Sequence, residues 1–408
     1  MGKILHLECR ECHAHYPAER LYFCPACFGP LDVKYRYDGV KWSRSFFQNA
    51  SKNLWRYFDL LPIEDKSKIV DIGAGFTPLI KATRLGKSLG LRNLYIKNDT
   101  VNPTFSFKDR PAGVGVSKAL EFGLKAVGCA STGNLAAATA AYAAKAGLRC
   151  YIFVPRGVER EKIAHALIYS PTVIEVNGSY DTANRVAAQA AEVYDIGVVN
   201  INLRTYYVEG SKTLGFEIAE QLGWQPPDHI ITPVGSGAML LAISKGLDEF
   251  EQLGLINSSK VKFTAAQPSG CAPIVEAFHR GSDIIEPVEQ PQTLAKSLAI
   301  GEPGDGVYVL RKLRECRGYA EAVSDLEIVE GIKLLAKTEG IFSEPAGGVV
   351  VGALKRLVED GRVDPDETIV CLITGSGLKA ADSLTPYLPE PLTTEPELEQ
   401  VARLIAGW

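Results

Sequence analysis

The feature that most constrains the fold is the regular alternation of short apolar runs with longer helical patterns. The apolar runs are typical of buried strands: RCYIFVP at 149–155, HIITPVG at 229–235 and TIVCLIT at 368–374. Between such runs lie helical patterns, for example the Ala-rich segment that closes on the helix-stop residue Gly147. Strands that are apolar on both faces and alternate with helices form a mostly parallel sheet covered on both sides. The sequence therefore predicts the α/β class.

Length and charge limit the number of domains and the kinds of partner that we expect. The chain has 408 residues, more than one hydrophobic core usually supports, so we expect two α/β domains. With a formal net charge of −4 and no long basic run, nucleic acid and anionic membrane are not expected partners. The N-terminus lacks the apolar run of a signal peptide, and no stretch is apolar enough to span a membrane. We expect a cytoplasmic protein.

Four of the nine cysteines form two CxxC pairs near the N-terminus: Cys9 with Cys12, and Cys24 with Cys27. In a reducing compartment this spacing indicates a metal site rather than disulfides. Four thiolates complete a tetrahedron around Zn²⁺ and leave no open position, which predicts a structural zinc ribbon. His13 and His15 are competing ligands in principle, and a degenerate ribbon that binds no metal is the alternative.

Small polar residues follow several of the predicted strands. They lie in four segments: FSFKDR at 105–110, STGN at 131–134, PVGSGAM at 233–239 and TGSG at 374–377. Each segment alone is weak, since a lone GSG is more often a tight turn than a phosphate cradle. In open α/β sheets, however, ligands bind beyond the carboxyl ends of the strands. Together the four segments predict one site built from four loops.

The groups in these loops match the chemical groups of pyridoxal 5′-phosphate (PLP). Backbone N–H groups ahead of a helix favour a phosphate, and one loop offers them from five consecutive residues: Gly235, Ser236, Gly237, Ala238 and Met239. Asn134 offers an amide to the phenolate oxygen, and Thr374 a hydroxyl to the ring nitrogen. Lys108 offers the amine that PLP requires for its covalent link. Without these companions, Lys108 would be read as an ordinary solvated lysine.

The segment NPTFSFKDR at 102–110 resembles the NPTGSFKDR motif of threonine synthases, which are fold-type-II PLP enzymes. Further similar segments follow in order over nearly the whole chain, among them CPACFGPLDVKYRYD, TPLIKATRLG, STGNLAAATAAYAAKAG, YYVEGSKTLGFEIAEQLGW, TLAKSLAIGEPGDG, TEGIFSEPAGG and LITGSGLKAAD. The resemblance implies a lyase of threonine biosynthesis, which converts O-phospho-L-homoserine and water to L-threonine and phosphate.

The resemblance also implies a domain plan of the tryptophan synthase β-like kind. We expect two mostly parallel-sheet domains and a small N-terminal zinc ribbon. The expected ranges are a zinc ribbon at 1–40, a large PLP-binding domain at 41–110 and 215–385, a small α/β domain inserted at 111–214, and a C-terminal helical tail at 386–408. We also expect a homodimer.

Roles for individual residues follow from the same resemblance. Lys108 is expected to carry PLP and then to move protons on the substrate. Ser131 and Thr132 are expected to meet the substrate carboxylate, with helix capping as the alternative. Glu344 either lies at the edge of the cofactor or caps the following helix. Three cations are candidates for the substrate phosphate, with a purely structural role as the alternative for each: Lys97, Arg110 and Arg204.

Three departures from the family pattern leave the substrate open. The phosphate loop reads PVGSGAM instead of an Asn-rich sequence, Phe105 replaces the glycine of the lysine motif, and Tyr207 stands where several members carry an arginine. A cysteate synthase, which joins phosphoserine and sulfite, or a threonine or serine dehydratase is therefore the first alternative. A more remote one is a zinc-bearing binding protein that kept the fold without catalysis.

Overall fold

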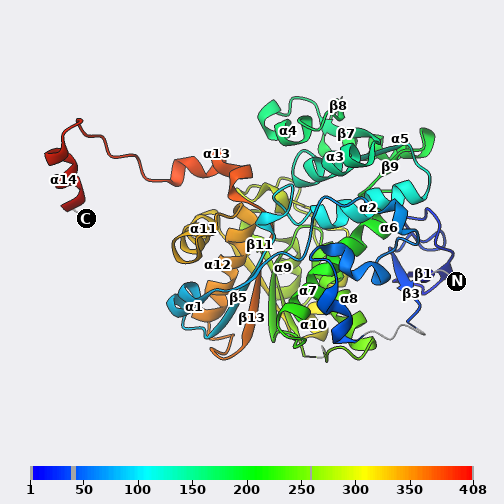
Figure 1. Ribbon diagram of the computed structural model, residues 1–408, viewed down its shortest axis with the longest axis horizontal. Helices are drawn as coiled ribbons and strands as arrows, with labels where there is room; N and C mark the ends of the chain where they lie inside the picture. Colours follow the sequence, from blue (N-terminus) through cyan, green and yellow to red (C-terminus); the bar gives the residue numbers. More distant parts are fainter. Residues whose placement is uncertain (1–2, 38–42, 258–259, 407–408) are drawn as a thin grey trace.

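The computed structural model describes residues 3–37, 43–257 and 260–406, and its strands form three sheets (Figure 1). The first is a small antiparallel sheet near the N-terminus, with the order β2-β1-β3. It consists of β1 (Ile4–Cys9), β2 (His15–Tyr16) and β3 (Leu31–Tyr35). We call residues 3–37 the ribbon.

The largest sheet has six strands in the order β12-β11-β10-β13-β5-β4. All neighbours are parallel except β4, which runs antiparallel to β5 at the edge. The strands are β4 (Leu79–Lys81), β5 (Asn93–Asn98), β10 (His229–Pro233), β11 (Lys262–Pro268), β12 (Tyr319–Val323) and β13 (Thr368–Ile373).

Alternate residues of the central strand β13 enter two different cores. Val370 and Leu372 pack with one set of helices, whereas Ile369 and Cys371 pack with another. The first set covers one face: α7 (Thr213–Gln221), α8 (Ala238–Gln252), α9 (Pro273–His279) and α10 (Gly306–Glu315). The second covers the other: α1 (Thr83–Leu89), α11 (Asp325–Glu339) and α12 (Pro345–Glu359). Side chains of a strand point alternately to the two faces, so burial of both faces explains why this strand is apolar throughout. We call this unit the large lobe.

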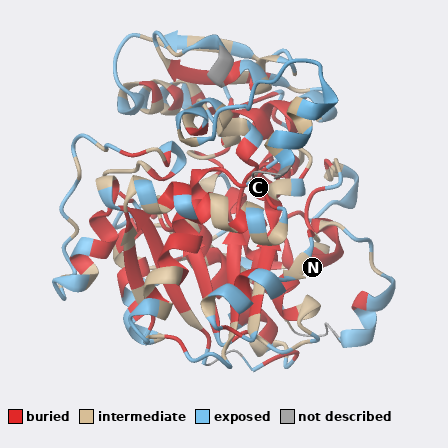
Figure 2. Ribbon diagram, turned by 90° about the vertical axis from the view of Figure 1, so that its left-hand side faces the viewer, coloured by how far each residue is buried: buried red, intermediate tan, exposed pale blue. Residues whose placement is uncertain are grey.

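A four-stranded, fully parallel sheet in the order β8-β7-β6-β9 forms the centre of a smaller lobe. Its strands are β6 (Ala126–Ala130), β7 (Arg149–Pro155), β8 (Thr172–Val176) and β9 (Gly197–Val198). The helices around it are α2 (Asp109–Glu121), α3 (Asn134–Ala146), α4 (Arg160–Leu167) and α5 (Tyr180–Val193). In Figure 2 this small lobe stands above the buried strands of the large lobe. The predicted α/β class with two mostly parallel sheets is thus confirmed.

Three further α-helices in the described residues are short or terminal: α6 (Arg204–Tyr207), α13 (Ala381–Leu384) and α14 (Leu398–Ala406). An extended segment carries α14 away from the body of the molecule (Figure 1). In the described part of the chain, no helix has the length and apolarity needed to cross a membrane. The domain ranges stay a prediction, and the boundary expected between residues 40 and 41 lies outside the described residues.

Candidate active site

Lys108 is held against the carboxyl end of β13 by paired backbones. The Phe107 N–H donates to Thr374 O at 2.8 Å, and the Ser376 N–H donates to Phe105 O at 3.0 Å. An isolated antiparallel bridge between Ser106 and Gly375 lies between these two bonds. Two of the four predicted loops, 105–110 and 374–377, therefore form one joined unit.

The amine of Lys108 lies in a site that favours its neutral form. Lys108 directly precedes α2, and its half-buried side chain places Nζ 4.5 Å from the centre of the Phe107 ring. Burial lowers the pKa of Lys108 to about 8, although the nearby Glu344 carboxylate acts in the opposite direction. A neutral amine is nucleophilic, so this lysine is suited to a covalent link with a carbonyl compound.

Glu344 joins the loop of the small lobe to this unit. The Asn134 amide, at the first residue of α3, donates to both carboxylate oxygens of Glu344, at 3.0 and 3.2 Å. The Glu344 N–H donates to Gly375 O at 2.9 Å, and a Cβ at Gly375 would lie only 2.3 Å from Glu344 Oε1. The carboxylate makes no hydrogen bond to the start of α12, which it precedes. Of the two roles left open for Glu344, the structure therefore favours the one in the site.

The turn that contains Ser131 and Thr132 leads from β6 into α3. Both residues are half-buried, and the Gly133 N–H donates to Ser131 Oγ at 3.3 Å. No side chain caps the start of α3. The first N–H groups of a helix without a cap are free to bind an anion such as a carboxylate. Binding of the substrate carboxylate by Ser131 and Thr132 stays a prediction.

The loop Gly235–Met239 follows β10, the neighbour of β13 in the sheet, and so leaves the sheet beside Thr374. Gly237, the N-cap residue of α8, has a φ of 102°, a left-handed conformation that favours glycine, and it has no side chain to cap the helix. The Ala238 N–H, the first of α8, makes a long contact of 3.5 Å with Ser236 Oγ. Ala238 packs against the core cluster that contains Cys129 and Leu135 of the small lobe. All four loops thus meet where the two lobes join.

These groups fit PLP. The start of α8, 15 residues long and without a side-chain cap, suits its phosphate. Lys108 supplies an amine of lowered pKa, and Asn134 supplies an amide. Thr374, which directly follows β13 and is only 3% exposed, supplies a hydroxyl.

Two of the three candidate phosphate-binding cations, Lys97 and Arg110, are enclosed with carboxylates, which favours the structural role left open for each. Lys97 Nζ lies 2.6 Å from Glu217 Oε2, and both side chains are fully buried. Arg110 Nε lies 2.7 Å from Asp99 Oδ2, and Arg110 also pairs with Glu217. Because Lys97 and Arg110 are themselves fully buried beside these carboxylates, their charge is not available to a substrate.

Arg204 differs from those two cations. Its side chain is 28% exposed and forms an ion pair with Asp305. The Asp305 N–H donates to Ser236 O at 3.0 Å, which places this pair beside the Gly235–Met239 loop. Tyr207, three residues later, is buried in the core cluster around α2 and α3 and does not replace the charge of an arginine.

Three titratable groups near the site were not predicted from the sequence. Lys379 donates to Thr104 O at 2.8 Å, and burial lowers its pKa to about 8. Burial also raises the pKa of Asp109 to about 7 and lowers that of His165 to about 4. The position of Lys379 just after TGSG was a usable signal, whereas His165 comes from α4, far along the chain from any of the four loops.

Phe105 shows the cost of one departure from the family motif. Its φ is 60°, in the left-handed region where a glycine is favoured, and its ring centre lies 5.9 Å from that of His165. Such a conformation costs a bulky residue about 1–3 kcal/mol. The phenylalanine therefore carries strain that the motif glycine avoids, and it places an aromatic ring against α4 of the small lobe.

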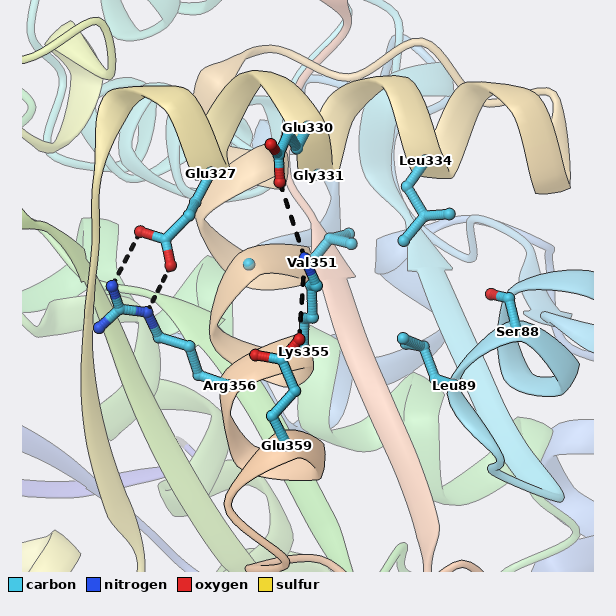
Figure 3. Close-up of a pocket in the computed structure, with 11 residues that line it drawn as sticks. Ser88, Leu89, Glu327, Glu330, Gly331, Leu334, Val351, Lys355, Arg356 and Glu359 are labelled. Atoms are coloured by element: carbon cyan, nitrogen blue, oxygen red, sulfur yellow. Dashed lines mark hydrogen bonds and ion pairs between the residues drawn. The ribbon is translucent and has the colours of Figure 1, made fainter.

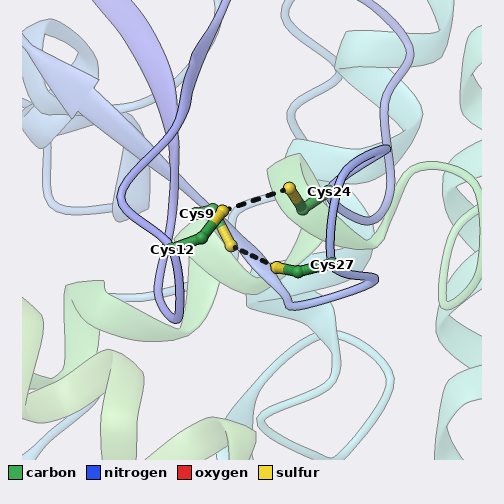
Figure 4. Close-up of side chains that lie close together, drawn as sticks. All are labelled: Cys9, Cys12, Cys24 and Cys27. Atoms are coloured by element: carbon green, nitrogen blue, oxygen red, sulfur yellow. Dashed lines mark hydrogen bonds between the residues drawn. The ribbon is translucent and has the colours of Figure 1, made fainter.

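The four N-terminal cysteines come together in the ribbon (Figure 4). Their sulfur atoms all lie within 4.8 Å of one another, with 3.4 Å between Cys9 and Cys27 and 3.6 Å between Cys12 and Cys24. Zn–S bonds of about 2.3 Å place tetrahedral thiolates about 3.8 Å apart, so the cluster fits this metal. His15 stacks on His6 at 3.8 Å instead of joining the cysteines.

A groove of about 340 Å³ lies on the large lobe, and its lining is distinct from the four loops (Figure 3). It is formed by α1, α11 and α12, and none of the residues that line it belongs to the four loops. Its charged side chains pair with one another, as Arg356 Nε does with Glu327 Oε1 at 2.7 Å. The groove is therefore separate from the candidate active site.

Comparison with known proteins also indicates an enzyme that uses PLP. Residues 70–375 match the family model described as pyridoxal-phosphate dependent enzyme. The threonine synthase of Methanocaldococcus jannaschii is 42% identical over 400 residues, which cover 97% of this chain and 98% of the relative. That of Methanosarcina acetivorans is 40% identical over 404 residues, 98% of this chain and 99% of the relative.

Solved structures show the same fold at lower identity. Threonine deaminase isoform 2 from Solanum lycopersicum, in its processed form, superposes with a TM-score of 0.64 at 22% identity and covers 77% of this chain and 88% of its own. Maize serine racemase gives a TM-score of 0.62 at 21% identity, with coverages of 76% and 92%. The fold-type-II architecture is thereby confirmed. On its sequence and its fold, the chain belongs to the threonine synthase family of pyridoxal-phosphate dependent enzymes.

Proposed function

We propose that this protein is a threonine synthase that converts O-phospho-L-homoserine and water into L-threonine and inorganic phosphate. The observation that carries the proposal is Lys108. It lies in NPTFSFKDR at the junction of four loops, and burial lowers its pKa to about 8. The chain around it is 42% identical to a threonine synthase over 97% of its length.

Lys108 has two roles in this proposal. At rest its amine would hold PLP covalently. When bound, PLP would supply an electron sink that stabilises negative charge on the substrate carbons near the amine. Once free, the Lys108 amine moves protons between Cα, Cβ and Cγ of the substrate. A pKa of about 8 lets the amine accept and donate protons near neutral pH.

The other loop residues hold and orient the reacting molecules. The start of α8 and the backbone of Gly235–Met239 would hold the cofactor phosphate. Asn134, whose amide donates to Glu344 in the structure, would hydrogen-bond the phenolate oxygen, and the Thr374 hydroxyl would face the ring nitrogen. Ser131, Thr132 and the start of α3 bind the substrate carboxylate. These assignments are supported by the uncapped helix starts and by the contacts that join the loops.

Arg204 is our remaining candidate for the substrate phosphate. Its guanidinium is partly exposed beside the Gly235–Met239 loop, whereas Lys97 and Arg110 are enclosed with their carboxylates. The leaving phosphate carries negative charge, so a cation at this point lowers the barrier to its departure. A homodimer is our expectation for the assembly, and the exposed apolar residues Leu398 and Ile405 of α14 support it.

The proposal predicts that O-phospho-L-homoserine yields L-threonine and phosphate in equal amounts, measured by amino-acid analysis and a phosphate assay. L-Homoserine should be inert, because hydroxide is a poor leaving group and recruits no binding energy from a cationic site. Product from phosphoserine and sulfite, without turnover of O-phospho-L-homoserine, would instead identify a cysteate synthase.

We further propose that the four ribbon cysteines bind one structural Zn²⁺. Metal analysis should give one zinc per chain, lost in Cys24→Ser, because three thiolates no longer close the site. The matched control is Cys316→Ser, which changes a cysteine outside the cluster and should keep the metal. A Cys24→Ser protein with full zinc content would rule out this ligand set.

A further inference from the structure

Asp305 connects three segments that are far apart in the sequence. It directly precedes α10 and is only 1% exposed. An aspartate at this position usually caps its own helix, but no such hydrogen bond is formed here. Its carboxylate instead pairs with Arg10 of the ribbon, whose Nη1 lies 3.4 Å from Oδ1, and with Arg204 of α6 through Oδ2.

The ribbon fixes the direction of Arg10. This residue immediately follows Cys9, and its N–H donates to Pro30 O at 3.0 Å. Its guanidinium makes a bidentate contact with Asp32 of β3, at 2.8 Å from Nε and 2.7 Å from Nη2. Bidentate pairs of this kind fix both the position and the plane of the guanidinium. The position of Arg10 against Asp305 is therefore set by the ribbon, in which Arg10 is the direct neighbour of Cys9.

Asp305 also contacts the Gly235–Met239 loop. The Asp305 N–H donates to Ser236 O at 3.0 Å. A Cβ on Gly237 would lie 3.1 Å from Asp305 Cβ and 2.6 Å from Val309 Cγ2. The hydrogen bond to Ser236 and this close packing connect the position of Asp305 to that of Gly237.

We propose that Asp305 is a positioning residue that couples the metal state of the ribbon to the hold of the Gly235–Met239 loop on the cofactor phosphate. This inference rests on the proposed function, which assigns the phosphate to that loop. When the ribbon loses its metal, Arg10 leaves Asp305 and removes one of the two cations that neutralise a buried carboxylate. A buried charge that has lost a partner is costly, so Asp305 moves and the loop loses its geometry.

The experiment measures the dissociation constant of PLP by dilution of the holoenzyme, before and after the ribbon metal is stripped with a chelator. In the unaltered protein, stripping should weaken PLP binding by about 5-fold to 150-fold, the usual range of coupling between two sites. Asp305→Asn should bind PLP more weakly with the metal in place, and stripping should then add little. Phosphorus NMR of bound PLP should show a shifted phosphate signal in this variant, which reports on the loop itself.

Two further variants separate coupling from a general loss of structure. Arg10→Gln should keep its zinc and still weaken PLP binding as stripping does, so it serves even if Asp305→Asn folds poorly. The matched control is Arg311→Gln, which breaks another ion pair between the ribbon and α10, at 2.9 Å from Glu11, without touching Asp305. It should behave like the unaltered protein.

Equal PLP affinity with and without ribbon metal would overturn the coupling. The coupling would also be overturned if stripping weakened PLP binding by the same factor in Asp305→Asn as in the unaltered protein. Two effects that multiply in this way are independent and need no shared contact. If the zinc-loaded, unaltered protein binds no PLP at all, the proposed function falls first and the coupling falls with it.

Discussion

Lys108→Ala should lower kcat for O-phospho-L-homoserine by about 10⁴-fold to 10⁶-fold, the scale seen when a group that acts covalently is removed. The variant loses the one amine that both holds PLP and moves protons. Borohydride should fix PLP on the peptide that contains Lys108 in the unaltered protein and on no peptide in the variant.

Lys379→Gln is the matched control. Lys379 is a second lysine of the same region whose pKa burial lowers to about 8, but its amine is bound to Thr104 O. The control should keep the borohydride-reducible link on Lys108. A link found on Lys379 or Lys97 would contradict the assignment of Lys108, as would a Lys108→Ala enzyme with near-normal turnover.

Arg110→Met should lower the free energy of unfolding by about 3–5 kcal/mol, because removal of one partner leaves buried charges unpaired. Arg110 neutralises Asp99 and Glu217, and its side chain is fully buried with theirs. The change is measured by chemical denaturation. The matched control is Arg92→Met, which breaks an ion pair to Asp366 whose side chains are 68% and 66% exposed. Arg92→Met should lower the free energy of unfolding by less than about 1 kcal/mol.

The same variant should become more sensitive to acid. Burial alone would raise the pKa of Glu217, but Arg110 and Lys97 hold it at about 2, below its ordinary value of 4.5. A lowered pKa contributes stability that is complete above 4.5 and is lost as the pH falls towards 2. Without Arg110 this contribution shrinks, so the acid unfolding midpoint should rise. Equal stability of Arg110→Met and Arg92→Met would show that the buried cluster is not structural.

The sequence predicted the fold because its signals are local. The apolar runs of β7, β10 and β13 need burial on both faces, and only a sheet between two layers of helices supplies it. The loops at the strand ends were predictable for the same reason, since parallel strands end at one edge of a sheet. The cysteine cluster was predictable from its spacing alone.

The partners of charged residues were not predictable, because they come from distant parts of the chain. Arg110 meets Glu217, which lies 107 residues later, and nothing near NPTFSFKDR indicates that pairing. Glu344 looked like a helix cap because it directly precedes α12, but its carboxylate meets Asn134 from the other lobe. Asp305 was not singled out for the same reason, since Arg10 and Arg204 belong to other segments.

The most direct test of the proposed reaction follows the oxygen of water. O-Phospho-L-homoserine is turned over in water labelled with heavy oxygen, and both products are analysed by mass spectrometry. If the C–O bond of the substrate breaks and water then adds at Cβ, the label appears in the hydroxyl of L-threonine and is absent from the phosphate. Label in the phosphate, with L-homoserine as the other product, would mean hydrolysis of the P–O bond and would contradict the threonine synthase account.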